Sequence, residues 1–300
     1  MPDPLPPVLQ LRRGKGDAIV PVDRAYYLRL VDSVSTLPDA VHAVMVQYPS
    51  WTPTSPAQSD SLEVGTRYVG RLVYEARVVH ALMSDLTWGV AKVLREPVNV
   101  FAPWTLARGL IESVGLLTWL LAPDLRPRER IGRSLTLRLH DFRERRMWVE
   151  CGDIGADQVE ELLARSENQL SAIAVELGIE LKISRDGKLL GYGCSKPGPT
   201  ERARDLGWEE AYRLESGIAH GFHWATSAAG LRQRDEANMQ VAIEPTLLVS
   251  VLSSAIVRHL RGTDSLFRYM GWDLEALAPS LDPLLDSVGL EDRLRPWRSM

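Results

Sequence analysis

The amino-acid sequence predicts an all-α protein: a helical bundle of six or more helices with one small β-hairpin insertion. Apolar residues recur at helical spacing through several long segments, and proline and glycine stand at the ends of those segments. Residues 179–193 carry β-type residues on both sides of an Asp-Gly turn, and residues 240–243 are expected to form a brief extended piece. The sequence shows no glycine-rich phosphate loop, no parallel βαβ series and no nucleophile elbow, which would indicate an α/β enzyme.

The N-terminal part of the chain is predicted to lie outside the main bundle. Residues 1–20 are rich in proline and predict a flexible N-terminal arm, which a helical lead-in at 21–60 follows. We expect Leu37–Pro38 to interrupt the helix of this lead-in, with a second short helix over 39–47.

The bundle is predicted to span 61–265, and short helices at 266–300 are predicted to pack on it. Proline stands in the first turn of several predicted helices, as at Pro103 and Pro245, and Gly178 suits a helix C-cap. The predicted helices of the bundle run over about 60–95, 102–121, 127–150, 156–177, 208–228 and 245–261.

Composition places the chain among ordinary globular proteins. It has 300 residues, of which 45% are hydrophobic, and its formal net charge of −4 excludes a global basic field for nucleic acid. Cys151 and Cys194 follow no metal-ligand spacing and are interpreted as small core residues in a reduced cytoplasm. The most apolar run, 110–122, is too short to span a bilayer, so we expect a cytoplasmic protein with no membrane partner.

One short stretch of the chain concentrates the polar residues that are candidates for a site. Arg213 and His220 are seven positions apart, so on a continuous helix they share one face, with Ser216 between them. Tyr212, Ser216 and His223 form the neighbouring row, from which they can contact a ligand. Because buried polar side chains need partners, this face is the candidate site.

Arg213 and His220 have the chemistry of metal-independent RNA cleavage. A histidine can move a proton near neutral pH, and a fixed guanidinium can hold a phosphate through two hydrogen bonds. The same face is also compatible with a hydrogen-bond network that only joins helices, or with a protein interface.

Arg108 and Glu112 form a second polar pair on an otherwise apolar helix. They are four positions apart, which is the spacing of an intrahelical ion pair. Because a buried glutamate needs a partner, Glu112 is expected to pair either with Arg108 or, across the bundle, with Arg213 or His220.

Eight arginines between positions 126 and 146 outnumber the acidic residues around them and make the best local candidate for phosphate contacts. Solvated helix faces carry such charges routinely, which is the alternative interpretation. These arginines are Arg126, Arg128, Arg130, Arg133, Arg138, Arg143, Arg145 and Arg146.

No metal or other cofactor is predicted. Glu215 and His220 are five positions apart, and so are Glu75 and His80, a spacing that splays two side chains on a helix. The Glu-x-x-His pair of di-iron bundles does not occur in the stretch around His220. A helix-bundle metalloenzyme is therefore the least favoured interpretation.

Arg213-x6-His220 resembles the Arg-x(4–6)-His motif of the HEPN superfamily. Members of that superfamily are helical bundles, often dimeric, and many are metal-independent RNases of toxin–antitoxin, abortive-infection or other defence systems. The resemblance implies Arg213 and His220 as the catalytic pair. It also implies RNA or a nucleotide as the ligand, a homodimer, and an antitoxin or other protein partner.

A longer pattern is similar to an uncharacterised bacterial domain family in which an Arg-x3-Glu helix precedes a Tyr-x3-Ser-x3-His helix. Arg108 and Glu112 match the first helix, and Tyr212, Ser216 and His220 match the second. The resemblance implies that these residues line one pocket.

Leu214 departs from the nuclease pattern, in which a polar residue usually follows the motif arginine. Non-catalytic members of the superfamily bind nucleotides or only dimerise. Two functions therefore stay open. One is a metal-independent RNase or nucleotide-binding HEPN-like protein of a defence or stress system, and the other is a non-catalytic ligand-binding or protein-interaction module.

Overall fold

The computed structural model of the protein describes residues 8–11, 20–48, 50–95, 99–152, 156–228, 231–233, 239–241 and 245–287. Within these residues, ten helices of seven or more residues confirm the predicted all-α fold class. None of the described helices combines the length and the apolar composition that crossing a lipid bilayer requires.

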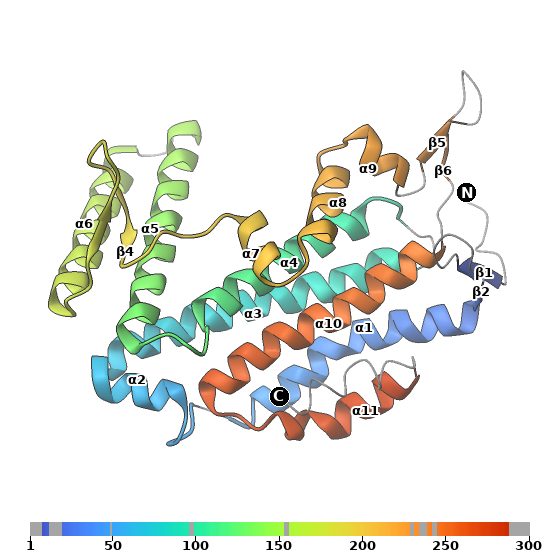
Figure 1. Ribbon diagram of the computed structural model, residues 1–300, viewed down its shortest axis with the longest axis horizontal. Coiled ribbons are helices and arrows are strands. Elements are labelled where there is room, and N and C mark those ends of the chain that lie inside the picture. Colours follow the sequence, from blue (N-terminus) through green and yellow to red (C-terminus); the bar gives the residue numbers. More distant parts are fainter. Residues whose placement is uncertain are drawn as a thin grey trace.

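Four long helices form the centre of the fold and lie side by side (Figure 1). They are α1 (Arg24–Met45), α3 (Thr66–Leu94), α4 (Ala102–Leu120) and α10 (Pro245–Met270). Each turns an apolar stripe toward one shared core, because burying these stripes against each other removes them from water. The fully buried leucines of this core include Leu30, Leu72, Leu110 and Leu260.

Gly262 lets α10 approach α3 and α4 closely. A Cβ atom at this position would clash with the Met83 side chain of α3 and would touch Val114 of α4 at 3.5 Å. The close crossing therefore requires a residue without a side chain on α10.

A second group of elements projects from one end of the central helices (Figure 1). It consists of α5 (Pro127–Gly152), α6 (Ala156–Glu176) and the hairpin of β3 (Leu181–Ile183) with β4 (Leu189–Tyr192). These elements confirm the predicted helices and the predicted hairpin. Gly187, in the turn between β3 and β4, has a φ of +80°, which glycine adopts without steric cost.

Two predicted helix boundaries in the N-terminal part of the chain are wrong. Pro38 lies inside the continuous helix α1, because burial of its neighbours Leu37 and Val41 against the core outweighs the lost backbone hydrogen bond. In the opposite sense, the predicted helix over 60–95 is two helices, α2 (Pro56–Val64) and α3. They meet at Gly65, whose φ of +103° ends the helical path.

Two further strand pairs occur whose pairing was not predicted, although the extended piece expected at 240–243 overlaps the last strand. β1 (Val8–Leu11) pairs with β2 (Val20–Asp23), and β5 (Leu231–Gln233) pairs with β6 (Met239–Val241), both antiparallel. Most of the predicted arm at 1–20 lies outside the described residues.

The C-terminal part packs against the first helix. α10 continues nine residues past its predicted end at 261, and a 3-10 turn (Leu274–Leu277) and α11 (Ala278–Ser287) follow it. Leu277 and Leu281 join the same hydrophobic core as the central helices. The division of the chain at 61 and 265 stays a prediction.

A buried ion pair joins three elements outside the centre of the core. Arg130 of α5 donates from Nη1 to both carboxylate oxygens of Asp60 in α2, at 2.8 and 2.7 Å. The Tyr269 hydroxyl of α10 donates to the same carboxylate at 2.9 Å. A buried charge without a partner is costly, so this cluster fixes how α2, α5 and α10 meet.

Asp60→Ala leaves Arg130 buried and unpaired, so we expect the free energy of unfolding to fall by about 3–5 kcal/mol. The matched control is Asp32→Ala, which removes an exposed ion pair with Arg95 at 2.8 Å and should cost less than about 1 kcal/mol. Urea denaturation of both variants measures this. Equal losses in the two variants would contradict the structural role of the buried pair.

Candidate functional site

The helix that carries the candidate residues is anchored by a buried ion pair. Glu215 of α8 (Glu209–Ala219) accepts a bond from Arg258 Nη1 of α10 at 2.9 Å, and both side chains are only 4% exposed. The same guanidinium donates to the backbone oxygen of Ala107 in α4 at 3.2 Å and lies over the Trp208 ring. α8 is thereby tied to α10 and α4 at once.

Burial dominates the electrostatics of Glu215. It raises the pKa of this carboxyl group to about 7, although the nearby Arg258 opposes the shift. One carboxyl oxygen, Oε2, has no hydrogen-bond partner within the described part of the chain. A proton held on Glu215 relieves the cost of an incompletely paired buried charge.

The predicted continuous helix over 208–228 is wrong, because α8 ends at Ala219. Gly221 has a φ of +68°, and the N–H of Phe222 donates to the backbone oxygen of Gly217 at 2.8 Å. This left-handed C-terminal cap stops α8, and a separate short helix, α9 (His223–Ala228), begins in a new direction. His220 therefore lies at the end of α8 rather than inside a longer helix.

Four of the candidate residues meet where α8 packs on α4. Arg108 Nε donates to Glu112 Oε1 at 2.9 Å, and the Tyr212 hydroxyl donates to the same oxygen at 3.0 Å. Arg108 Nη1 lies 3.3 Å from His220 Nε2. Burial and the carboxylate of Glu112 raise the pKa of Tyr212, so its hydroxyl stays a donor at neutral pH.

Arg213 does not join this cluster. Its side chain is exposed, and its Nη2 and Nε donate to Glu209 Oε1, one turn earlier on α8, at 2.7 and 3.0 Å. Arg204 binds the same carboxylate, and hydrogen bonds from these two arginines lower the pKa of Glu209 to about 2. Within the described residues, the guanidinium that contacts His220 comes from Arg108.

The two remaining candidates lie close to the cluster without bonding to it. Ser216 is half-buried one turn before His220, and its backbone oxygen accepts the His220 N–H at 3.0 Å. His223 is exposed at the first position of α9. Ser216 thus shares the face of the cluster, whereas His223 follows the turn that ends α8.

Two cations that the sequence analysis did not single out lie near Glu112. Arg202 in α7 (Pro199–Asp205) is buried, donates to the backbone oxygen of Pro197 at 2.6 Å and has no partner for Nε among the described residues. Burial lowers the pKa of Lys196, and the charge of Arg202 lowers it further. Both interact electrostatically with Glu112, and no spacing in the sequence marks either of them.

Exposed aromatic side chains border the cluster. The rings of His220 and Phe222 are 5.9 Å apart, and the side chain of Phe222 is 54% exposed. Trp224 is 57% exposed and its ring lies against Gly217, where a Cβ atom would come within 2.8 Å of it. Gly217 therefore makes room for an aromatic surface beside His220.

The arginine-rich segment of α5 is largely neutralised by its own contacts. Arg133 and Arg143 donate to the backbone oxygens of Trp119 and Leu189. The others form ion pairs with carboxylates. These are Arg126, Arg128, Arg130, Arg138, Arg145 and Arg146. This arrangement favours the alternative interpretation of a charged helix face.

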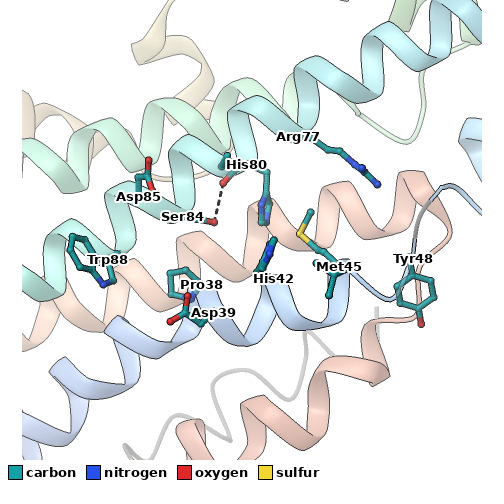
Figure 2. Close-up of a pocket in the computed structure, with 12 residues that line it drawn as sticks. Pro38, Asp39, His42, Met45, Tyr48, Arg77, His80, Ser84, Asp85 and Trp88 are labelled. Carbon is teal, nitrogen blue, oxygen red and sulfur yellow. Dashed lines mark hydrogen bonds between the residues drawn. The ribbon is translucent and has the colours of Figure 1, made fainter.

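A cavity of about 830 Å³ lies between α1 and α3, where His42 and His80 approach each other (Figure 2). The Thr263 hydroxyl donates to the backbone oxygen of His259, so it must accept from His80 Nε2, 3.1 Å away. Burial lowers the pKa of His80 to about 4. A neutral, hydrogen-bonded His80 serves packing better than acid–base chemistry at neutral pH.

Metal binding finds no support in the geometry. Across the described ranges, no three His, Cys, Asp or Glu side chains lie close enough together to hold a metal ion. Glu215 is buried with Arg258, whereas His220 is exposed at the end of the helix. Glu215 and His220 therefore do not share a ligand set.

Comparisons with protein-family models, with curated proteins and with solved structures find no match for this chain. The contacts among α4, α8 and α7 are therefore the basis for any functional argument.

Glu215→Gln should remove a pH dependence of stability. A carboxyl group with a pKa of about 7 when folded and about 4.5 when unfolded stabilises the fold at low pH, and this stabilisation is lost as pH rises to 7. Between pH 5 and pH 8, we expect the free energy of unfolding of the wild type to fall by roughly 1–3 kcal/mol more than that of the variant. Urea denaturation at the two pH values measures the difference, and parallel losses would contradict the raised pKa.

Proposed function

We propose that this protein binds RNA where Arg108 meets His220 and cleaves it without a metal ion. The observation that supports this proposal is the distance of 3.3 Å between Arg108 Nη1 and His220 Nε2. A guanidinium suited to phosphate thus lies beside an imidazole suited to proton transfer, which are the two groups that such cleavage needs. Arg108 takes the role that the sequence motif gives to Arg213.

The hydrogen-bonding capacity of these groups defines a mechanism. A guanidinium can only donate, so His220 Nε2 is an unprotonated acceptor when Arg108 contacts it. A phosphate bound to Arg108 frees Nε2 to accept the proton of a 2′-hydroxyl. The 2′-oxygen then attacks phosphorus, the bond to the 5′-oxygen breaks, and the 5′-oxygen takes up a proton from the imidazolium or from water. Arg108 stabilises the charge that develops on the phosphoryl oxygens.

The surroundings of the pair favour a nucleic-acid ligand. Arg202 and Lys196 add positive charge beside Arg108 and Glu112, and this charge favours an anionic ligand although Glu144 and Glu201 compensate part of it. Phe222 and Trp224 offer exposed rings on which bases can stack, as in proteins that bind single strands.

A second candidate is binding of RNA or a nucleotide without turnover. Leu214, which stands where nuclease members carry a polar residue, packs half-buried against the hydrophobic core. Of the described histidines, His220 alone contacts the arginine of the site, so no second imidazole supports proton transfer. Binding that persists in a His220 variant, with no cleavage by the wild type, favours this candidate.

The resemblance adds predictions about partners. A HEPN-like role in defence or stress predicts a homodimer and an antitoxin or other protein that restrains the activity. The first of these, the homodimer, is tested by measuring the mass of the protein in solution. The second is tested by co-purification of the tagged chain from its native host.

His220→Ala and Arg108→Ala should each lower the rate of RNA cleavage by about 100-fold or more, because each removes a group that acts on the reacting phosphate. Cleavage of a fluorescent single-stranded RNA in the presence of EDTA measures this. Equal rates in wild type and His220→Ala, or none in either, would refute cleavage at this site. Circular dichroism checks that both variants are folded.

Arg213→Ala is the matched control. It removes an arginine from α8, the helix that His220 follows, and the guanidinium of this arginine binds Glu209 instead of His220. We expect its rate to stay within about twofold of the wild type, as for a surface substitution. A loss as large as that of Arg108→Ala would restore Arg213 to the role that the motif assigns.

A further inference from the structure

We propose that the outer face of α3 binds the same face of α3 in a second copy of this chain, with the two helices antiparallel. We call this surface the α3 face and define it by five residues: Arg71, Tyr74, Val78, Leu82 and Asp85. Their spacing of three or four positions puts them on one side of the helix. This inference does not depend on the proposed function.

The α3 face carries a row of exposed apolar residues. Tyr74, Val78 and Leu82 are 67%, 50% and 52% exposed, and they follow each other at one-turn intervals. The opposite side of α3 packs on α1, α4 and α10. An apolar row in water, flanked by charges, is typical of a surface that another protein covers.

The row is complementary to itself in the antiparallel direction. With Val78 on a twofold axis, Tyr74 of one copy lies opposite Leu82 of the other, since each is four positions from the axis. Arg71 and Asp85 are each seven positions from it, so each arginine lies opposite an aspartate. In a twofold contact, if a residue of the first copy faces a given residue of the second, the same two positions also face each other with the copies exchanged. The four charged side chains therefore form two pairs, each of one arginine and one aspartate.

The two charged residues make no direct polar contact in the described part of their own chain. Within the described ranges, neither the Arg71 guanidinium nor the Asp85 carboxylate forms an ion pair or a hydrogen bond. Glu75, one turn from Arg71, attracts it electrostatically, but its direct contacts are with Ser134 and Arg138. A carboxylate supplied by a second copy would compensate Arg71, which partial burial and the charge of Arg138 otherwise disfavour.

The proposal is tested by sedimentation velocity over a range of protein concentrations. The wild type should show twice the mass of the chain. Val78→Glu should raise the dissociation constant at least tenfold, because two carboxylates then face each other on the axis. Arg71→Glu and Asp85→Arg should each do the same through repulsion.

The double variant Arg71→Glu, Asp85→Arg distinguishes a specific contact from general damage. It exchanges the signs of both pairs, so the dissociation constant should return to within about threefold of the wild type. Arg165→Glu, an equal charge change on exposed α6, should leave dimerisation unaltered. Circular dichroism and the melting temperature confirm that each variant is folded.

Three outcomes would overturn the proposal. One is a monomeric wild type at about 100 μM, which excludes even a weak complex. Another is a dimer that Val78→Glu leaves intact, since it must form elsewhere. The third is a double variant whose dimer stays as weak as that of the two single variants.

Discussion

The position of the site depends on the buried pair of Glu215 and Arg258. Both side chains are buried and need a hydrogen-bond partner there, so α8 must lie where its glutamate reaches Arg258 of α10. The same arginine bonds to the backbone of Ala107, which sets the distance between α8 and α4. Tyr212 and His220, on the same helix, are thereby brought against Arg108 of α4. The buried pair of Glu215 and Arg258 thus places residues of α8 and α4 in one polar cluster, although neither member of the pair belongs to that cluster.

Which arginine meets His220 follows from the direction of side chains on a helix. Side chains of a helix lean toward its N-terminus, so Arg213 extends back to Glu209 and away from His220. His220 stands at the left-handed cap of α8, where the helix ends and leaves its ring accessible to α4. Sequence spacing alone predicts on which face of a helix a residue lies. Neighbouring charges and the helix end decide what its side chain contacts.

The fold class was predictable because helix ends and the hairpin turn are encoded locally. Pro103 and Pro127 begin their helices as expected, and Gly187 forms the predicted turn. Local rules failed where packing outweighs them, as at Pro38 inside α1. The site was predictable in part. The helical spacing of Arg108 with Glu112 indicated their pair, whereas the approach of Arg202 depends on α7 packing against α4, which no short pattern encodes.

The two proposed surfaces have separate places in the fold. α4 lies between α3 and α8, so a second copy on the α3 face leaves the α8 side of each chain open. HEPN-like nucleases often bring two motif helices together across a dimer axis, and this arrangement does not. In the proposed mechanism, Arg108 and His220 of one chain supply both the cation and the imidazole. A dimer through α3 would therefore carry two separate copies of the proposed site, each on the side of its chain that the dimer contact leaves open.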